Sequence, residues 1–294
     1  MAKIGRVLAL GVALALWAPS VQAAALDALY FEQRLDGLER AARALLADSR
    51  KDNDAEAHAW LSRAYTRHGR LDRARAALRQ AGTASLAGVL AHGDYALFTG
   101  DYPAARAHFE RAVTMAPKDV HALWGLAAAL LALREYERAE QAAARAHAGA
   151  GSLPPSYRSQ ALAIYGGVLG LRAQAGFVDA VTAGPRARGM LEQAVALAPN
   201  NPYARFALGR FYLAAPGYFG GGADKAVAEL RRAVALNPHY FPAHAFLIQA
   251  LHHAEQGQQA ARELAAYRRK FAGSQRALQE LEMLLGSNLQ AIKP

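Results

Sequence analysis

The sequence contains no cysteine among its 294 residues. The chain therefore has no disulfide framework, thiol nucleophile, thiolate zinc site or lipid-modified N-terminal cysteine. Familiar catalytic motifs are also missing: there is no Gly-x-Ser-x-Gly elbow, no His-Glu-x-x-His helix and no dinucleotide-binding glycine fingerprint. We therefore expect a protein that is not an enzyme and that uses no cofactor.

Acidic residues are the minority charge, with 24 Asp and Glu against 34 Lys and Arg and a formal net charge of +10. Hydrophobic residues make up 53% of the chain and charged residues 20%, a balance that favours a folded core over disorder. Ten histidines are present, but the cluster of His239, His244, His252 and His253 matches no familiar ligand spacing. We expect these histidines to be solvated or packed, with no metal bound.

The first 23 residues have the layout of a secretory signal peptide. Lys3 and Arg6 precede an apolar segment from Val7 to Trp17, and the segment 21–23, Val-Gln-Ala, forms a small-x-small cleavage site. The apolar segment is too short to cross a hydrocarbon layer ~30 Å thick as a helix. We expect cleavage after Ala23 and a periplasmic or otherwise exported protein; the alternative is an uncleaved anchor in the inner membrane.

The mature chain would lose the two cations of this segment and carry a formal charge of +8. An exported basic protein meets anionic envelope surfaces, such as lipid head groups and cell-wall carboxylates. We therefore expect no nucleic-acid partner. Binding to an anionic envelope surface is one of three functional hypotheses that the sequence leaves open.

A repeat with a fixed period runs through the rest of the chain. Tyr102, Ala105 and Ala112 recur 34 residues later as Tyr136, Ala139 and Ala146. In this period and these residues the chain resembles the tetratricopeptide repeat (TPR) family over most of residues 55–271. The resemblance implies an all-α fold, a TPR-like right-handed α-solenoid of about five to six helix hairpins with capping helices.

Small residues stand where the two helices of each hairpin must touch, because neither helix can bury its apolar face alone. Larger side chains are expected to fill the space between the small ones, and three prolines, Pro117, Pro199 and Pro238, are expected to end second helices. Asn201 and Pro202 are typical of a helix N-cap followed by proline in the first turn. The small positions are Ala74, Ala105, Ala139, Ala187 and Ala226, then Ala81, Ala112, Ala146, Ala194 and Ala233; the large ones are Leu78, Phe109, Leu191 and Leu230.

The spacing of the prolines divides the chain into segments. We expect a signal peptide at 1–23, an N-terminal capping helix within 24–53, three repeats at 54–151, a divergent enlarged unit at 152–199, repeats five and six at 200–272, and a C-terminal capping helix and tail at 273–294. Extra residues are expected at 174–185, where Gly176, Gly184 and Pro185 would interrupt the helical pattern, and in the turn 214–222.

The three consecutive glycines Gly220, Gly221 and Gly222 stand before a helix expected to begin near Asp224. Glycine amides at a helix start can hold an anion, but this run lacks the lysine of a phosphate loop and Asp224 would repel an anion. A structural turn is the favoured interpretation. The segment 216–222 also resembles an elongated turn of some bacterial exported repeat proteins, including the TatT components of tripartite periplasmic transporters, which implies a small anionic ligand as an alternative.

The resemblance also implies a concave groove lined by the first helix of each unit. Aromatic and cationic side chains at the groove positions would anchor a partner by stacking and by bidentate recognition of carboxylates. Chaperone-type binding of peptide C-termini is excluded, because the required lysine and asparagine are replaced by residues such as Arg63, Asp94 and Trp124. The groove residues carried over are Arg63, Arg67, Leu90, Asp94, Phe98, His121, Trp124, Tyr203, Phe206, Arg210, Gln249, His252 and His253.

The leading hypothesis is a non-catalytic adaptor or scaffold in the bacterial cell envelope that binds a protein partner in this groove. The alternative is a TatT-like periplasmic accessory that binds a small anionic ligand for a transporter. A third hypothesis is binding to cell-wall or lipid surfaces, driven by the +8 charge of the mature chain. The groove residues Phe98, Trp124 and Phe206 also have a packing interpretation, because apolar side chains at helical spacing are commonly core.

Overall fold

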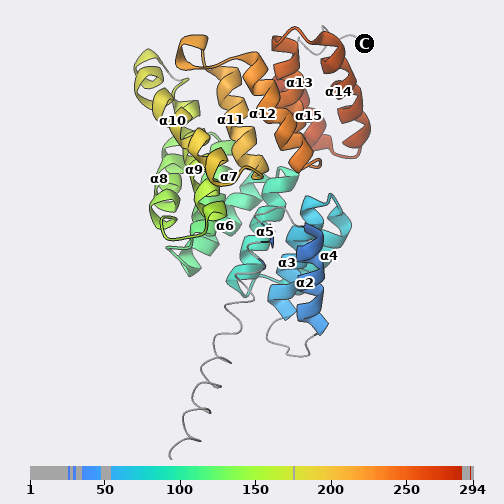
Figure 1. Ribbon diagram of the computed structural model, residues 1–294. Coiled ribbons are helices and arrows are strands. Elements are labelled where there is room, and N and C mark those ends of the chain that lie inside the picture. The colour runs from blue at the N-terminus through green and yellow to red at the C-terminus, as the bar shows by residue number, and fades with distance from the viewer. Residues whose placement is uncertain are drawn as a thin grey trace, which may run out of the picture.

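The computed structural model describes residues 26, 29–30, 35–47, 54–174, 176–286 and 292; the predicted signal peptide lies outside them. Within these ranges the structure has fourteen α-helices, a 3-10 turn and no strand, which confirms the all-α solenoid (Figure 1). No described helix has both the length and the apolar character needed to cross a membrane. The hairpins are α3 (Asp54–Arg67) with α4 (Leu71–Ala81), α5 (Leu86–Thr99) with α6 (Tyr102–Met115), α7 (Val120–Ala132) with α8 (Tyr136–Gly149), α9 (Pro155–Arg172) with α10 (Phe177–Leu197), α11 (Pro202–Ala214) with α12 (Ala223–Leu236), and α13 (Phe241–His253) with α14 (Gly257–Lys270).

Hairpin packing follows the small and large positions of the repeat. All ten alanines are buried, and Phe109, Leu191 and Leu230 are fully buried between them. Each large side chain fits against a helical glycine: a Cβ atom would lie 2.7 Å from Phe109 at Gly93, 2.8 Å from Leu191 at Gly166 and 2.7 Å from Leu230 at Gly209. These approaches leave no room for a methyl group, so the glycines set the distance between the two helices.

Side-chain caps and prolines define the helix ends, as the sequence predicts. The Asn201 side chain accepts hydrogen bonds from the backbone N–H groups of Tyr203 and Ala204, and Pro202 begins α11. Asp101 and Asp119 cap α6 and α7 in the same way. Helices α6, α10 and α12 end two residues before Pro117, Pro199 and Pro238, because proline disfavours helical backbone before it.

The enlarged unit differs from the expected form. The extra residues lengthen the helices: α9 has 18 residues and α10 has 21, whereas most other hairpin helices have 13 or 14. Gly184 and Pro185 lie inside α10 and do not interrupt it, so the expected break is wrong there. Tertiary packing overrides the local cost of proline, since Ala183, Ala187 and Leu191 are buried along this helix. The second extension, at 214–222, forms a turn that contains the 3-10 segment η2 (Gly217–Phe219).

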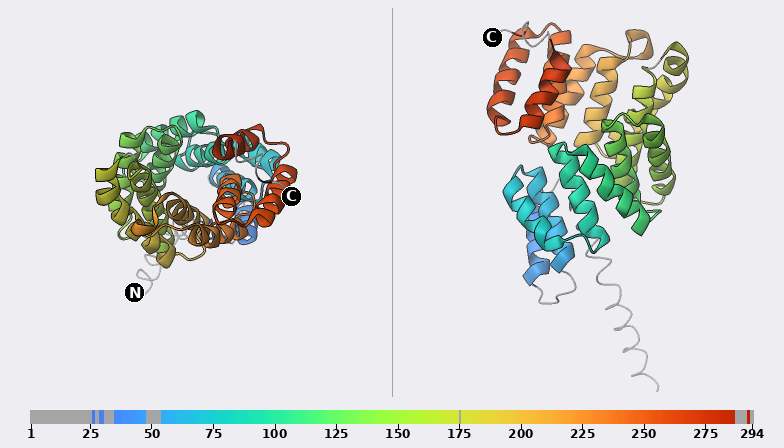
Figure 2. Two further views of the ribbon diagram at one scale, coloured as in Figure 1. Left: turned by 90° about the horizontal axis from the view of Figure 1, so that it is seen from above. Right: turned by 180° about the vertical axis from the view of Figure 1, so that it is seen from behind.

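The solenoid turns once around and brings its two ends together. Helices α13 to α15 lie directly over α2 (Leu35–Ala47), α3 and α4, and the view from above shows the helices following a ring (Figure 2). The Tyr102 hydroxyl donates a hydrogen bond of 3.3 Å to Glu280 Oε2 in α15 (Gln275–Leu285), and Arg276 Cζ lies 4.9 Å from the Tyr102 ring centroid. Gly69 lies against His239, where a Cβ atom would be 2.4 Å from the ring Nδ1. We call this set of contacts the seam.

The first helices of the hairpins form the inner layer of the ring. Residues on all sides of α3, α7 and α13 are buried, whereas α4, α6 and α12 bury a single stripe. A helix that is buried all round lies between other layers, and one with a single buried stripe faces solvent. The inner layer therefore holds the side chains that the sequence assigns to the groove.

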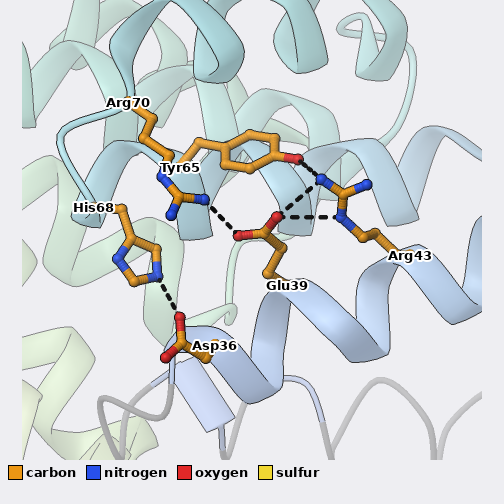
Figure 3. Close-up of polar contacts among 6 residues, drawn as sticks. All are labelled: Asp36, Glu39, Arg43, Tyr65, His68 and Arg70. Atoms are coloured by element: carbon orange, nitrogen blue, oxygen red, sulfur yellow. Dashed lines mark hydrogen bonds and ion pairs between the residues drawn. The ribbon is translucent and has the colours of Figure 1, made fainter.

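Helix α2 covers the open end of the first hairpin through polar contacts (Figure 3). Glu39 accepts hydrogen bonds from Arg43 Nη2 over 2.9 Å and from Arg70 Nη1 over 3.0 Å, and Arg43 also donates to the Tyr65 hydroxyl. Burial alone would raise the pKa of Glu39, but the Arg43 hydrogen bond and the two guanidinium charges lower it. Leu38, Ala42 and Leu45 are buried on the same helix, so α2 acts as a cap.

Candidate functional site

The N-terminal half of the inner layer is built around one carboxylate, Asp94 on α5. Arg63 Nε on α3 donates a hydrogen bond of 2.8 Å to one oxygen of Asp94, and His121 Nε2 on α7 lies 2.9 Å from the other. Burial alone would raise the pKa of Asp94, but the charges and hydrogen bonds of His121 and Arg63 hold it below its usual range. Three consecutive first helices are thus joined by one ionic network.

Aromatic rings enclose this network. Arg63 Cζ lies 4.4 Å from the Trp60 ring centroid, and Trp124 packs between His121 and Tyr157 with ring centroids 5.0 and 5.5 Å away. Both Arg63 and Trp124 are buried, at 3% and 5% exposure. The packing interpretation of the sequence therefore describes the geometry of Trp124. Arg63 and His121 are engaged with Asp94 beside it, and the role of all three residues in partner binding stays a prediction.

Arg67 on α3 connects the first hairpin to the fifth. Its Cζ atom lies 4.2 Å from the Tyr30 ring centroid and 4.6 Å from that of Tyr203 on α11. Burial alone would lower the pKa of Arg67, but the tyrosines and Asp94 raise it. This predicted groove residue is therefore part of the closure of the ring.

The C-terminal half of the inner layer has a different chemistry. Phe206 on α11 packs edge-on against Tyr240 and against Phe246 on α13, with ring centroids 5.1 and 5.5 Å away. Arg210, one turn further along α11, has its Cζ atom 5.5 Å from the Phe206 centroid and 4.7 Å from the Phe246 centroid. The result is a guanidinium that lies beside a pair of phenylalanine rings in contact with each other.

Seven of the predicted groove residues keep part of their surface open. Asp94 and Tyr203 are engaged in the contacts described above, and His253 is exposed at the end of α13. The other four are Phe98, Arg210, Gln249 and His252. None of them makes a hydrogen bond or an ion pair with any residue in the described ranges. Phe246, Gln249 and His252 follow one another at three-residue spacing on α13 and share one side of that helix. Sequence reasoning missed Phe246 and Tyr240; the position of Phe246 three residues before Gln249 is the signal that could have found it.

The glycine run is a structural turn. The N–H groups of Gly220, Gly221 and Gly222 donate to the carbonyls of Gly217, Pro216 and Tyr212 over 2.9, 3.1 and 2.8 Å. Their amides are therefore already satisfied and do not point at an anion. Lys225 Nζ closes the turn on the Gly220 carbonyl over 3.1 Å.

The two extended segments meet around a cavity of about 40 Å³. Ligand pockets are typically ~300–1,000 Å³, and no charged side chain lines this one. The expectation that the segments shape a pocket for a small anionic solute is therefore not supported at this place. The lining residues are Gly170, Ala173, Gln174, Ala180, Gly184, Phe211, Ala214, Ala215, Pro216 and Phe219.

A larger open groove of about 680 Å³ runs along the outer side of the last repeats. Leu247 and Leu251 form its apolar part on a different side of α13 from Phe246, and Arg231 and Arg262 flank it. Arg231 donates a hydrogen bond to Gln259 across the groove, from α12 to α14. This outer groove provides a reference surface for experiments on the inner one.

The histidine cluster is dispersed in the structure. Nδ1 of His244 lies 2.6 Å from Glu263 Oε1 and Nε2 lies 3.0 Å from the Pro238 carbonyl, so His244 joins α13 to α14. His239 faces Gly69 at the seam, and His252 and His253 lie at the end of α13. Hydrogen bonding and packing account for His244 and His239.

Residues 90–153 match a family model for tetratricopeptide repeats. Two bacterial TPR proteins have crystal structures similar to this chain. One from Thermus thermophilus has a TM-score of 0.55 at 21% identity, over 68% of this chain and 99% of the other. One from Parabacteroides merdae has a TM-score of 0.50 at 13% identity, over 85% and 91%. At these identities the likeness shows the fold; no curated protein matches the sequence.

Proposed function

We propose that this tetratricopeptide-repeat protein is a non-catalytic adaptor that binds a protein partner on the inner layer of its ring, over α11 and α13. A TPR fold is in itself a scaffold for protein interactions. The observation that carries the finer proposal is the contrast between the two halves of the inner layer. Asp94 and its neighbours are engaged with one another, whereas Arg210, Gln249 and His252 make no hydrogen bond or ion pair within the described ranges.

Interface chemistry supports this placement. Binding hot spots are enriched in aromatic and arginine side chains, and Phe206, Phe246 and Arg210 place such groups beside one another. Partly exposed polar groups around them, such as Gln249, would form the rim of such a site. Phe98, on α5, adds an aromatic side chain from the opposite half of the inner layer.

The cellular location that we propose is the bacterial cell envelope. The support is the signal-peptide layout of residues 1–23 and the basic charge of the mature chain. N-terminal sequencing of the natively produced protein tests it. A chain that begins at Ala24 supports export with cleavage, whereas a chain that keeps residue 1 and sediments with membranes supports the anchored form.

In-cell photocrosslinking tests the adaptor function. A photoreactive amino acid is placed at Phe98 or Gln249 on the inner layer, and at Arg262 in the outer groove as a matched control. Phe206, at 8% exposure, is too buried to carry the probe. We expect one recurrent protein from both inner positions and not from Arg262, and one-to-one binding when both proteins are purified. The same mixture of bystanders from all three positions would contradict the proposal.

A further inference from the structure

Arg210 differs from the other arginines of the inner layer in how its charge is compensated. Arg63 forms an ion pair with Asp94 at 2.8 Å, and Arg205, on the same helix as Arg210, forms one with Glu229 at 2.7 Å. Arg210 has no carboxylate within ion-pair distance among the described residues. Its ring contacts are with Phe206 and Phe246, and Tyr240 packs against Phe206 in turn.

This arrangement is costly for the free protein. Burial lowers the pKa of Arg210, and the groups that act against this effect are the hydroxyls of Tyr240, Tyr102 and Tyr136 and the carboxylate of Glu280. Glu280, the one carboxylate among them, is bound by the Tyr102 hydroxyl, and burial raises its own pKa. The guanidinium thus keeps unused N–H donors in an environment of low polarity. The attraction between such a guanidinium and an added anion is stronger there than in water.

We propose that Arg210 is the recognition residue of the inner layer, and that it binds the carboxylate of an acidic side chain flanked by apolar residues in the partner. The guanidinium fork supplies two parallel N–H donors to a carboxylate, and the adjoining rings of Phe206 and Phe246 supply apolar surface beside it. The hydroxyl of Tyr240, whose ring packs against Phe206, supplies a further donor within the same cluster. This inference rests on the proposed function, because it names the chemistry that the adaptor surface recognises.

A direct binding experiment tests the inference without knowledge of the partner. The full mature chain is titrated with the capped peptide Gly-Phe-Glu-Phe-Gly, with the same peptide carrying Gln in place of Glu, and with free glutarate. We expect the Glu peptide to bind at least tenfold more tightly than the Gln peptide. Arg210→Met should abolish this difference, and Arg210→Lys should retain only part of it, because ammonium lacks the planar fork.

Arg231→Met in the outer groove is the matched control and should leave the difference between peptides intact. Thermal unfolding of Arg210→Met monitors the fold; we expect only a small change in stability, because the lost ring contacts are offset by removal of a charge without an ion-pair partner in the described ranges. Equal binding of the two peptides by the wild-type chain, or retained discrimination in Arg210→Met, overturns the inference. If free glutarate binds as tightly as the Glu peptide, the assignment to a protein side chain is overturned.

Failure of this inference is distinguishable from failure of the adaptor function. When Arg210→Met is combined with the photoreactive residue at Phe98, loss of the captured protein supports the role of Arg210. Undiminished capture overturns the inference and leaves the adaptor function standing. Absence of a recurrent protein in the chain that keeps Arg210 contradicts the adaptor function itself.

Discussion

Arg67 in the first repeat stacks on Tyr203 in the fifth, with the guanidinium carbon 4.6 Å from the ring centroid. The two residues are far apart in sequence, so their contact depends on the whole turn of the solenoid. Together with the Tyr102–Glu280 hydrogen bond, it turns an array of hairpins into a ring whose ends support each other.

Removal of the Tyr203 ring should weaken this closure. Tyr203→Ala loses the stack on Arg67 and the edge contact with Tyr240, whose centroid is 5.1 Å away. We expect a loss of about 2–3 kcal/mol in the free energy of unfolding, measured by urea denaturation. Tyr218→Ala is the control, because Tyr218 is 79% exposed and should change stability by less than about 0.5 kcal/mol. Equal effects would contradict closure through Tyr203.

Two adjacent glycines of α9 should respond in opposite directions to the same substitution. In Gly166→Ala the new methyl group would lie 2.8 Å from Leu191 Cγ and 3.1 Å from the Ala187 carbonyl. We expect a loss of about 1–3 kcal/mol from overpacking. At Gly167 nothing lies within 4 Å, so Gly167→Ala should gain about 0.5–1 kcal/mol from helix propensity. Thermal unfolding of the two variants checks the sign of each change.

The ionic network of Asp94 should make stability depend on acid pH. Because the pKa of Asp94 is lowered in the folded state, its contribution is complete above about pH 4 and is lost as the pH falls through the folded-state value. Asp94→Asn should cost about 3 kcal/mol at pH 7, since Arg63 keeps a buried charge without its partner. The difference between wild type and variant should shrink below about pH 4 in urea titrations. A difference that stays constant with pH would assign the effect to packing.

Glu280 should show the opposite dependence on pH. Burial raises its pKa in the folded state, so ionisation opposes folding, and stability falls as the pH rises from the unfolded-state value through the folded-state value. Glu280→Gln keeps an acceptor for the Tyr102 hydroxyl and removes the charge. We expect it to stabilise the chain by about 0.5–1 kcal/mol at pH 8, a value kept small because the side chain is partly exposed, and by almost nothing at pH 4. A destabilised variant at pH 8 would show that the Glu280 charge supports the seam.

The repeat itself could be predicted from the sequence, because its packing is encoded locally. Alanines such as Ala105 and Ala139 recur with the period, and each is fully buried where the pattern places it. The caps follow equally local rules, as at Asn201. The form of the enlarged unit could not be predicted in this way, because burial of Ala187 and Leu191 outweighs the helix-breaking tendency of Pro185.

Which groove residues contact other side chains of the ring could not be predicted from the sequence, for a different reason. Whether Arg67 lines an open groove or meets Tyr203 depends on small rotations between repeats that accumulate over six hairpins. The same accumulation engages Arg63 in the Asp94 network and leaves Arg210 without an acidic partner in the described part of the chain. The residue types predicted the chemistry of the inner layer. Only the closed ring shows which of these side chains already interact with other residues of the chain.

The ring also constrains the number of repeats. In an open solenoid a hairpin can be duplicated or lost, because each unit touches only its neighbours and the ends are free. Here one hairpin more or fewer would carry Tyr203 away from Arg67 and Glu280 away from Tyr102. The number of hairpins is therefore fixed by the closure of the ring. Gain or loss of a hairpin during evolution would require loss of the seam contacts.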